Sequence, residues 1–394
     1  MRCSGDAMPL DRPEIWPDPI AAERSDGLVP KTGSLGWTIR TPSPERMALS
    51  EVDFSAPGFS RLWHGLGVQG KLRFMRRLLL VGCEVGAGVA FDCAEAIGRH
   101  ARRRILRIQV GVRQQPGSRR VALYAHYCAT GRVSAMVMQQ LRAYAAAGFA
   151  VVFATASPAI AEEDWEELAS IAALLVQRRN HGLDFGAWYD LADTLAGRWP
   201  DAEELLLVND SVLGPIRPLE PVFAALRGAG EGLFGLTDSW QGGGHLQSYF
   251  LLGRGSGVVA EMLAFMHRAP ISASKWLMVQ RCEMGMSRHM HRKGFRVAAL
   301  FGYERLLAAI TAHAPDGLAH LAPAGITLPN RPLNPVHHLW RPLVCLLGFP
   351  FVKTELVRRN PGRLPQVGSW TALVGPESPT SASMLAGHLA EIGP

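Results

Sequence analysis

The chain of 394 residues is 48% hydrophobic and 19% charged, which is typical of a globular protein with one large domain and extensions, or with two domains. Its formal net charge is +7, and arginines crowd residues 73–120. Such a basic segment is either a solvated helix face or a surface for an acidic partner, such as a membrane or a phosphorylated substrate. No recognised motif for nucleic acid accompanies the charge, so nucleic acid is the least favoured partner.

The cysteines and the apolar runs bear on the compartment. The six cysteines are far apart and form no CxxC pair, which argues against a zinc site or a disulfide framework and favours a reducing cytoplasm. The acidic, proline-rich start predicts no signal peptide. No window of ~18 apolar residues is free of charge, so no membrane span is expected.

The chain order predicts an α/β domain between two extensions. Residues 1–50 are expected to be irregular or disordered, and 51–115 to form a basic helical extension. Strands are then predicted at 121–127, 149–157, 173–180, 204–210, 232–238 and 246–253, and helices at 134–148, from 161, and at 184–197, 257–268 and 275–292. This alternation indicates a mostly parallel, Rossmann-like sheet flanked by helices over 116–312. Residues 313–394 are expected to be an irregular extension that packs on the domain, with a disordered tail.

The apolar run 205–208 ends abruptly in Asn209, Asp210 and Ser211. Polar residues after a buried strand lie at the carboxyl edge of the sheet, where open α/β sheets bind ligands. A carboxylate with oxygen-bearing neighbours is suited to Mg²⁺ or Mn²⁺ while substrate phosphates complete the coordination. The alternative is a simple polar turn, since these residue types favour turns.

A second polar cluster, RRNHGLDFGAW at 178–188, follows the preceding strand. Asp184 occupies a position expected for a helix N-cap, so that free backbone N–H groups follow it. Arg178 and Arg179 carry charge suited to a diphosphate. In the simpler interpretation Asp184 only caps the helix and the arginines are surface residues.

Several motifs in the same order resemble those of the rhamnan synthesis F family of glycosyltransferases. They are RRNHGLDFGAW, LLLVNDSVLGP, GLFGLTDS, HLQSYFLLG and CEMGMS, followed by LNPVHHLW and GFPFVKTELVRRNP, and the likeness runs from about 121 to 370. The resemblance implies a GT-A-like fold and transfer of a sugar, plausibly rhamnose, from a nucleotide donor to a cell-surface polysaccharide such as lipopolysaccharide O-antigen. GT-A enzymes commonly carry a DxD motif after the fourth strand, whereas this chain has a single carboxylate there.

Chemistry then assigns roles in binding the donor. Tyr124 and His126, at the end of the first strand, are expected to face the base and the ribose. Asn180 and Asp184 are suited to hydroxyls of the sugar or ribose, and Arg179 to the diphosphate.

The diphosphate is expected to lie beside Asp210. Asp210 would ligate the metal, acting as a Lewis acid for the departing nucleotide, with Asn209 and Ser211 in support. Lys275 or Arg281 is suited to neutralising the leaving phosphate; either is equally well explained as a surface charge.

An inverting transfer also needs a base near the acceptor hydroxyl. Glu283, in an apolar and Met-rich stretch, is the first choice, and Asp238 and His245, which flank the glycines 242–244, are the alternatives. A retaining enzyme needs no such base.

Three functions remain open at this point. The first is a metal-assisted hexosyltransferase, rhamnosyltransferase-like, whose partners are a nucleotide-sugar donor and a glycan or polyprenyl-linked acceptor, located in the cytoplasm or peripherally at the inner face of the membrane. The second is a non-catalytic, glycan- or nucleotide-sugar-binding member of a polysaccharide-synthesis complex. The third, a phosphatase-like or response-regulator-like domain, is disfavoured because those folds place the key aspartate after an early strand.

Overall fold

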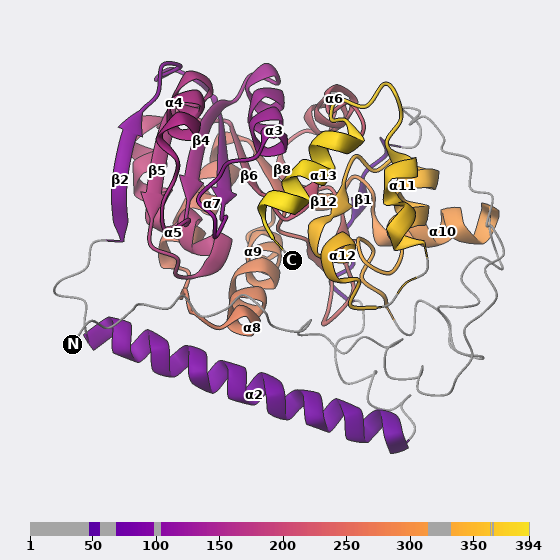
Figure 1. Ribbon diagram of the computed structural model, residues 1–394. Helices are drawn as coiled ribbons and strands as arrows, with labels where there is room; N and C mark the ends of the chain where they lie inside the picture. The colour runs from indigo at the N-terminus through magenta and orange to yellow at the C-terminus, as the bar shows by residue number, and fades with distance from the viewer. Residues whose placement is uncertain are drawn as a thin grey trace.

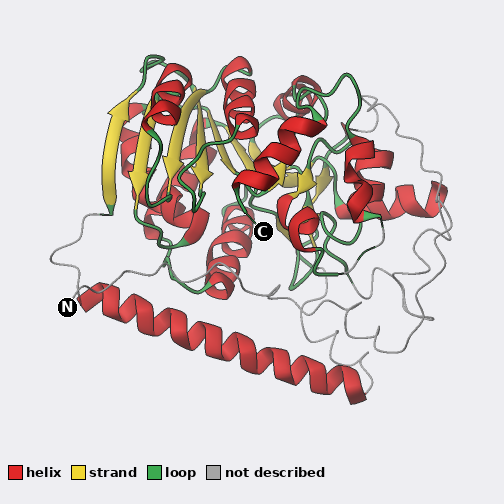
Figure 2. Cartoon of the chain, in the orientation of Figure 1, coloured by secondary structure: helices red, strands yellow, loops and turns green. Residues whose placement is uncertain are grey.

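The computed structural model describes residues 47–55, 68–97, 104–313, 332–362, 364 and 366–393. The predicted irregular segment 1–50 therefore lies almost entirely outside the described residues. The described chain is an α/β protein with a mixed central sheet flanked by helices (Figures 1 and 2).

Within the described residues the main sheet has nine strands in the order β1-β12-β8-β11-β6-β3-β4-β5-β2. Its parallel centre has the predicted βαβ crossovers, and consists of β3 (Arg120–His126), β4 (Ala150–Thr155), β5 (Leu174–Arg178) and β6 (Glu204–Asn209). Beyond β6, the strand β11 (Phe250–Arg254) runs antiparallel to β6 and to β8 (Gly232–Gly235), and β12 (Val297–Ala299) is parallel to β8. No helix lies between β8 and β11, and these two strands pair antiparallel.

Alternate residues of the central strands pack into separate cores on the two faces of the sheet. Ala122 and Tyr124 of β3 face one core, whereas Leu123 and Ala125 face the other. The first face is covered by α3 (Ala135–Ala146), α4 (Glu162–Ile171), α6 (Glu220–Gly228), α10 (Tyr303–His313) and α11 (Trp340–Leu347). The second is covered by α5 (Leu183–Arg198), α7 (Ser256–Arg268) and a continuous helical stretch made of α8 (Lys275–Met278), η3 (Val279–Glu283) and α9 (Met284–Arg292).

The C-terminal residues pack on the first face. They form β13 (Val352–Lys353), α12 (Thr354–Arg359), η4 (Val367–Leu373) and α13 (Ala382–Glu391). Where the sequence predicts a disordered tail, α13 packs on α3, and its His388 lies 2.7 Å from the Ser134 hydroxyl. Two small sheets complete this region: β7 (Val212–Leu213) with β13, and β9 (Asp238–Ser239) with β10 (His245–Leu246).

The segment predicted as a helical extension contains both helix and strand. Helix α2 (Val68–Ile97) runs along the outside of the domain (Figure 1), while β1 (Ser50–Glu51) and β2 (Ile105–Val110) form the two edges of the main sheet. Through β1 and β2, the N-terminal extension is part of the same sheet as the parallel strands β3 to β6. Among the described helices, none is both long and apolar enough to cross a bilayer.

Candidate functional site

Polar side chains gather where the parallel strands end. Because β8 and β6 both run antiparallel to β11, the end of β6, the end of β8 and the start of β11 lie at the same edge of the sheet. This edge carries Asn209–Ser211, Asp238 and Ser248.

Asp210 is held at this edge by backbone groups. Its Oδ2 accepts a hydrogen bond of 2.8 Å from the Tyr127 N–H, and its own N–H donates to the Ala125 carbonyl at 3.3 Å. Both partners belong to the end of β3 and the residues after it. Asp210 remains only half-buried, and Oδ1 takes no part in these bonds. The carboxylate is therefore fixed in position while one oxygen is available.

Lys353 reaches the same place from far along the chain. Strand β13 pairs with β7 immediately after the Asn-Asp-Ser turn, so that Lys353 lies opposite Val212. Its Nζ donates to the Ser211 hydroxyl at 2.7 Å and lies 5.4 Å from the centre of the Tyr249 ring. The Ser211 hydroxyl donates in turn to Asn209 Oδ1 at 2.5 Å. A half-buried ammonium group thus stands beside the two polar neighbours of Asp210.

Asp184 joins this group through Asn209, whose side-chain amide donates to Asp184 Oδ2 at 2.6 Å. The N-cap of α5 is Gly182, with φ of 78°, so the prediction that Asp184 is the cap was wrong; Asp184 lies inside the first turn and points to β6. Gly186 permits this start, because a Cβ there would come within 1.9 Å of the His181 carbonyl oxygen. We call Asp184, Asn209, Asp210, Ser211 and Lys353 the edge cluster.

The ionisable groups of the edge cluster shift one another's pKa values. Burial, followed by the negative charge of Asp184, raises the pKa of Asp210 to about 7. Burial likewise raises the pKa of Asp184 to about 6, although Lys353 and the Asn209 amide oppose that shift. Burial lowers the pKa of Lys353 despite the carboxylates around it. Two carboxyl groups with raised pKa values at a strand end are typical of functional sites.

The raised pKa of Asp210 predicts that the free energy of unfolding decreases as the pH rises. Since the folded pKa is above the unfolded value, the folded protein holds a proton that the unfolded chain loses, and stability falls as pH rises from about 4 to 7. In metal-free buffer, Asp210→Asn should raise the free energy of unfolding at pH 8 by about 2 kcal/mol, and the gain should vanish toward pH 4. Urea denaturation at pH 8, 6 and 4 measures this; a loss of stability at pH 8 would be the opposite result.

Glu283 lies beside the edge cluster, in a second group of polar side chains. Its Oε2 accepts a 2.8 Å hydrogen bond from the Ser248 hydroxyl, and its Oε1 lies 3.6 Å from His245 Nε2. The other ring nitrogen of His245 is 2.8 Å from the Gly243 carbonyl oxygen, which assigns the ring proton to Nδ1. Glu283 is the last residue of a π-helical turn, a feature frequent at functional sites. Its charge contributes to the pKa shifts of both Asp184 and Lys353, so the two groups are neighbours.

Three other residues singled out from the sequence are buried. Tyr124 is fully buried and donates to Gln140 at 2.5 Å, and His126 is buried with Nδ1 3.0 Å from the Thr155 hydroxyl. Burial lowers the pKa of His126 to about 3, which keeps it neutral. Asp238 is buried too, and accepts a hydrogen bond from the Tyr303 N–H at 2.7 Å.

The basic candidates divide into two places. Lys275 is the first residue of α8, and its charge opposes the rise in the pKa of Asp184. Arg179 lines a different, basic pocket together with Arg104 and His181, and Asn180 is exposed next to it. Arg178 is buried and binds Asp190 at 2.9 Å.

Sequence reasoning missed two members of the site. Lys353 is in the GFPFVKTE motif, and its place beside Ser211 depends on a strand pairing that no local pattern shows. Ser248 lies in HLQSYFLLG, a motif in which the sequence indicates only a strand. In both cases a polar residue borders an apolar run, and this position is the sequence feature that indicates a functional residue.

The edge cluster offers a divalent cation two carboxylates. Within the described residues no group of three or more His, Cys, Asp and Glu side chains is placed to hold a metal. Mg²⁺ is commonly bound by one or two carboxylates with substrate phosphates and water supplying the rest. Asp210 and Asp184, whose pKa values burial raises, are two such carboxylates, and they fit a substrate-completed site and not an all-protein one.

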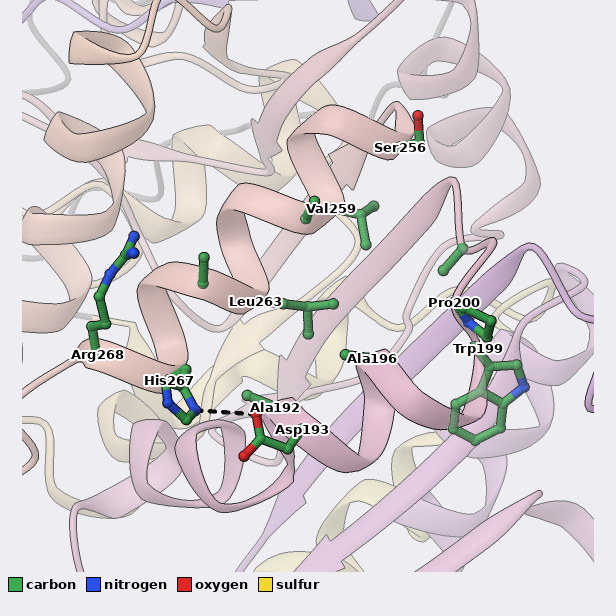
Figure 3. A pocket seen from close by; sticks show the side chains of 13 residues that line it. Ala192, Asp193, Ala196, Trp199, Pro200, Ser256, Val259, Leu263, His267 and Arg268 are labelled. Atoms are coloured by element: carbon green, nitrogen blue, oxygen red, sulfur yellow. Dashed lines mark ion pairs between the residues drawn. The ribbon is translucent and has the colours of Figure 1, made fainter.

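A groove between α5 and α7 lies apart from these groups (Figure 3). It has a volume of about 430 Å³ and is lined largely by small apolar residues, with Trp199 at one end and the His267–Asp193 ion pair of 3.1 Å at the other. None of its lining residues belongs to the edge cluster. It therefore lies between two packed helices, separate from the edge cluster.

Comparison with known proteins supports the motif-based resemblance. The model of the family described as Rhamnan synthesis protein F matches residues 151–320, a range that contains Asp184, the Asn-Asp-Ser turn and Glu283. Virulence protein VirA of Vibrio anguillarum is 26% identical over 212 residues, which cover 51% of this chain and 67% of VirA. The uncharacterised protein y4gN of Sinorhizobium fredii is 26% identical over 202 residues, 50% of this chain and 52% of y4gN. The predicted resemblance to this family is confirmed.

Proposed function

Since residues 151–320 match the rhamnan synthesis protein F family, which indicates a role in polysaccharide synthesis, we propose that this chain is a glycosyltransferase. It moves a sugar, rhamnose by analogy with the family, from a nucleotide-sugar donor to a polysaccharide or lipid-linked glycan. The catalytic domain has a GT-A-like fold. The observation that carries the proposal is the edge cluster: Asp184, Asp210 and Lys353 converge at the carboxyl edge of the sheet, where α/β folds bind ligands.

The edge cluster is suited to the diphosphate of the donor. Asp210 and Asp184 would hold Mg²⁺ or Mn²⁺, which when bound supplies Lewis-acid stabilisation of the leaving nucleotide. Lys353, which is bonded to Ser211, would neutralise charge that develops on the departing diphosphate, and Lys275, whose charge acts on the pKa of Asp184, would assist it. Ser211 and Asn209 orient Lys353 and Asp184 by hydrogen bonds.

Glu283 is suited to the acceptor. As a general base in an inverting reaction, its carboxylate takes the proton of the acceptor hydroxyl while the acceptor oxygen bonds to the anomeric carbon, the sugar–phosphate bond breaks and its electron pair leaves with the diphosphate. The Ser248 hydroxyl bonds one oxygen of Glu283 and leaves the other toward His245, so the carboxylate is held in one orientation.

Replacing Glu283 tests this assignment. Glu283→Gln keeps the hydrogen bond from Ser248 but removes the base, so the transfer rate should fall by about 100-fold or more while nucleotide affinity stays within about 2-fold. Glu304→Gln, an exposed position on α10, is the matched control. The readouts are nucleotide release from candidate donors and product formed on glycan acceptors; unchanged transfer by Glu283→Gln would remove this residue from the chemistry and point to a retaining reaction or another base.

A second candidate function is binding without catalysis. The single acidic residue in the Asn-Asp-Ser turn favours a non-catalytic subunit that binds nucleotide sugar or glycan in a synthesis complex. The pure protein distinguishes the two, since a binding subunit shows nucleotide affinity without donor turnover. The catalytic function is preferred because Glu283 and Lys353 add a base and a charge-neutralising group to the binding residues.

A further inference from the structure

Hydrogen bonds to Glu84 and Asp92 attach one face of helix α2 to the domain. Glu84 accepts hydrogen bonds of 2.8 Å from the Ser274 hydroxyl and from the Lys275 N–H, and Asp92 accepts one of 2.9 Å from the Ala273 N–H. Gly88 lies between them, and a Cβ there would come within 2.6 Å of the Ser274 Cβ. The spacing of four places these three residues on a single face of the helix. This face is the docking face.

The opposite face of α2 is apolar and exposed. Leu72 is 66% exposed and Leu79 is 68% exposed, both far above what a packed leucine shows. They belong to a stripe at helical spacing that we call the outward face: Val68, Leu72, Met75, Leu79 and Cys83. In Figure 1 no helix or strand of the described residues covers this side of α2.

The charges of α2 are divided between its two faces. The acidic Glu84 and Asp92 are used on the docking face. Among its described side chains, the exposed charge is that of Arg76, while Lys71 and Arg77 are half-buried at the margins. Among the described side chains, what α2 shows to the outside is therefore apolar surface with basic charge, a pattern that complements an anionic lipid surface.

We propose that α2 docks the protein on an anionic membrane, lying in the plane of the interface with its outward face among the lipids. The arrangement is independent of sugar transfer, because the outward face shares no residue with the edge cluster. A peripheral position at the membrane would also place the proposed enzyme beside a lipid-linked acceptor.

Co-sedimentation with vesicles tests the docking. The full chain should bind vesicles of phosphatidylcholine mixed with phosphatidylglycerol and bind phosphatidylcholine vesicles much less. The double variant Leu72→Glu/Leu79→Glu should partition at least about tenfold less, because two leucines no longer enter the lipid and two negative charges face an anionic surface. The control Thr371→Glu/Ala372→Glu adds the same charge at exposed positions of η4 and should bind as the unchanged protein does.

Two further measurements make each outcome decisive. Circular dichroism and nucleotide affinity should be unchanged in the Leu72→Glu/Leu79→Glu variant, so that failure of docking is distinguished from misfolding and from failure of the proposed function. No binding of the unchanged protein to phosphatidylglycerol vesicles, or equal binding of the variant, overturns the proposal. A dimer in solution that becomes monomeric in the variant, with no vesicle binding, would instead assign the outward face, with its open Gly82 and Gly86, to a second copy of the chain.

Discussion

Asp210→Asn is expected to reduce donor turnover by at least about 100-fold. Asparagine keeps the hydrogen bond from the Tyr127 N–H and nearly the same shape, but removes the negative charge on which cation and diphosphate binding would depend. The fold should be retained, since the variant relieves a carboxylate whose pKa burial has raised. Nucleotide release from a sugar nucleotide in the presence of Mn²⁺ measures the effect.

The exposed Asp201→Asn provides the control for Asp210→Asn. It makes the same chemical change at the end of the loop after α5 and should leave turnover within about 2-fold, as is usual for exposed substitutions. Full turnover by Asp210→Asn would remove this carboxylate from the reaction and return the Asn-Asp-Ser sequence to the role of a polar turn.

Lys353→Met is expected to lower kcat by about 100- to 1000-fold, the usual cost of removing one preorganised group that stabilises developing charge. Methionine retains the length and apolar stem of the side chain, and the backbone pairing of β13 with β7 does not involve the ammonium group. Because the charge matters most as the diphosphate departs, kcat should fall more than KM rises. Steady-state kinetics with a nucleotide-sugar donor separates the two parameters.

Three variants distinguish a chemical role of Lys353 from a structural one. Lys353→Arg keeps the charge and should recover part of the lost rate, whereas Ser211→Ala removes only the hydrogen bond to Nζ and should cost a few-fold. Lys293→Met, at an exposed lysine, should have little effect. If Lys353→Met retained more than half of the rate, Lys353 would be a structural partner of Ser211 and the leaving diphosphate would need another cation.

The sequence predicted the elements that form the centre of the fold. The strands β3 to β6 are short apolar runs that alternate with amphipathic helices, and the polar residues after β6 indicated the functional edge. In a strand that helices cover on both sides, the local sequence pattern does not show which face a side chain takes. The sequence therefore predicts Tyr124, at the expected end of β3, as a donor-binding residue, whereas its ring points into the core. The N-cap of α5 was also misplaced, because the backbone at Gly182 and Leu183 adopts positive φ values that shift the start of the helix.

The remainder of the site depends on distant pairing. Lys353 reaches Ser211 because β13 adds to β7, and this pairing is a tertiary contact with no periodic signal in either two-residue strand. Glu283 was found by its apolar surroundings, but its orientation depends on a π-helical turn and on Ser248. Similarly, the sequence shows a basic segment over residues 73–120, but only the docking contacts of Glu84 and Asp92 show which face of α2 is outward.

Calorimetric titration with dTDP, GDP and UDP, each with and without Mn²⁺, tests the central claim most directly. The proposed donor site predicts micromolar binding of one nucleotide that requires the metal and disappears in Asp210→Asn. Absence of binding by all three nucleotides, with and without metal, would contradict a nucleotide-sugar site at the edge cluster.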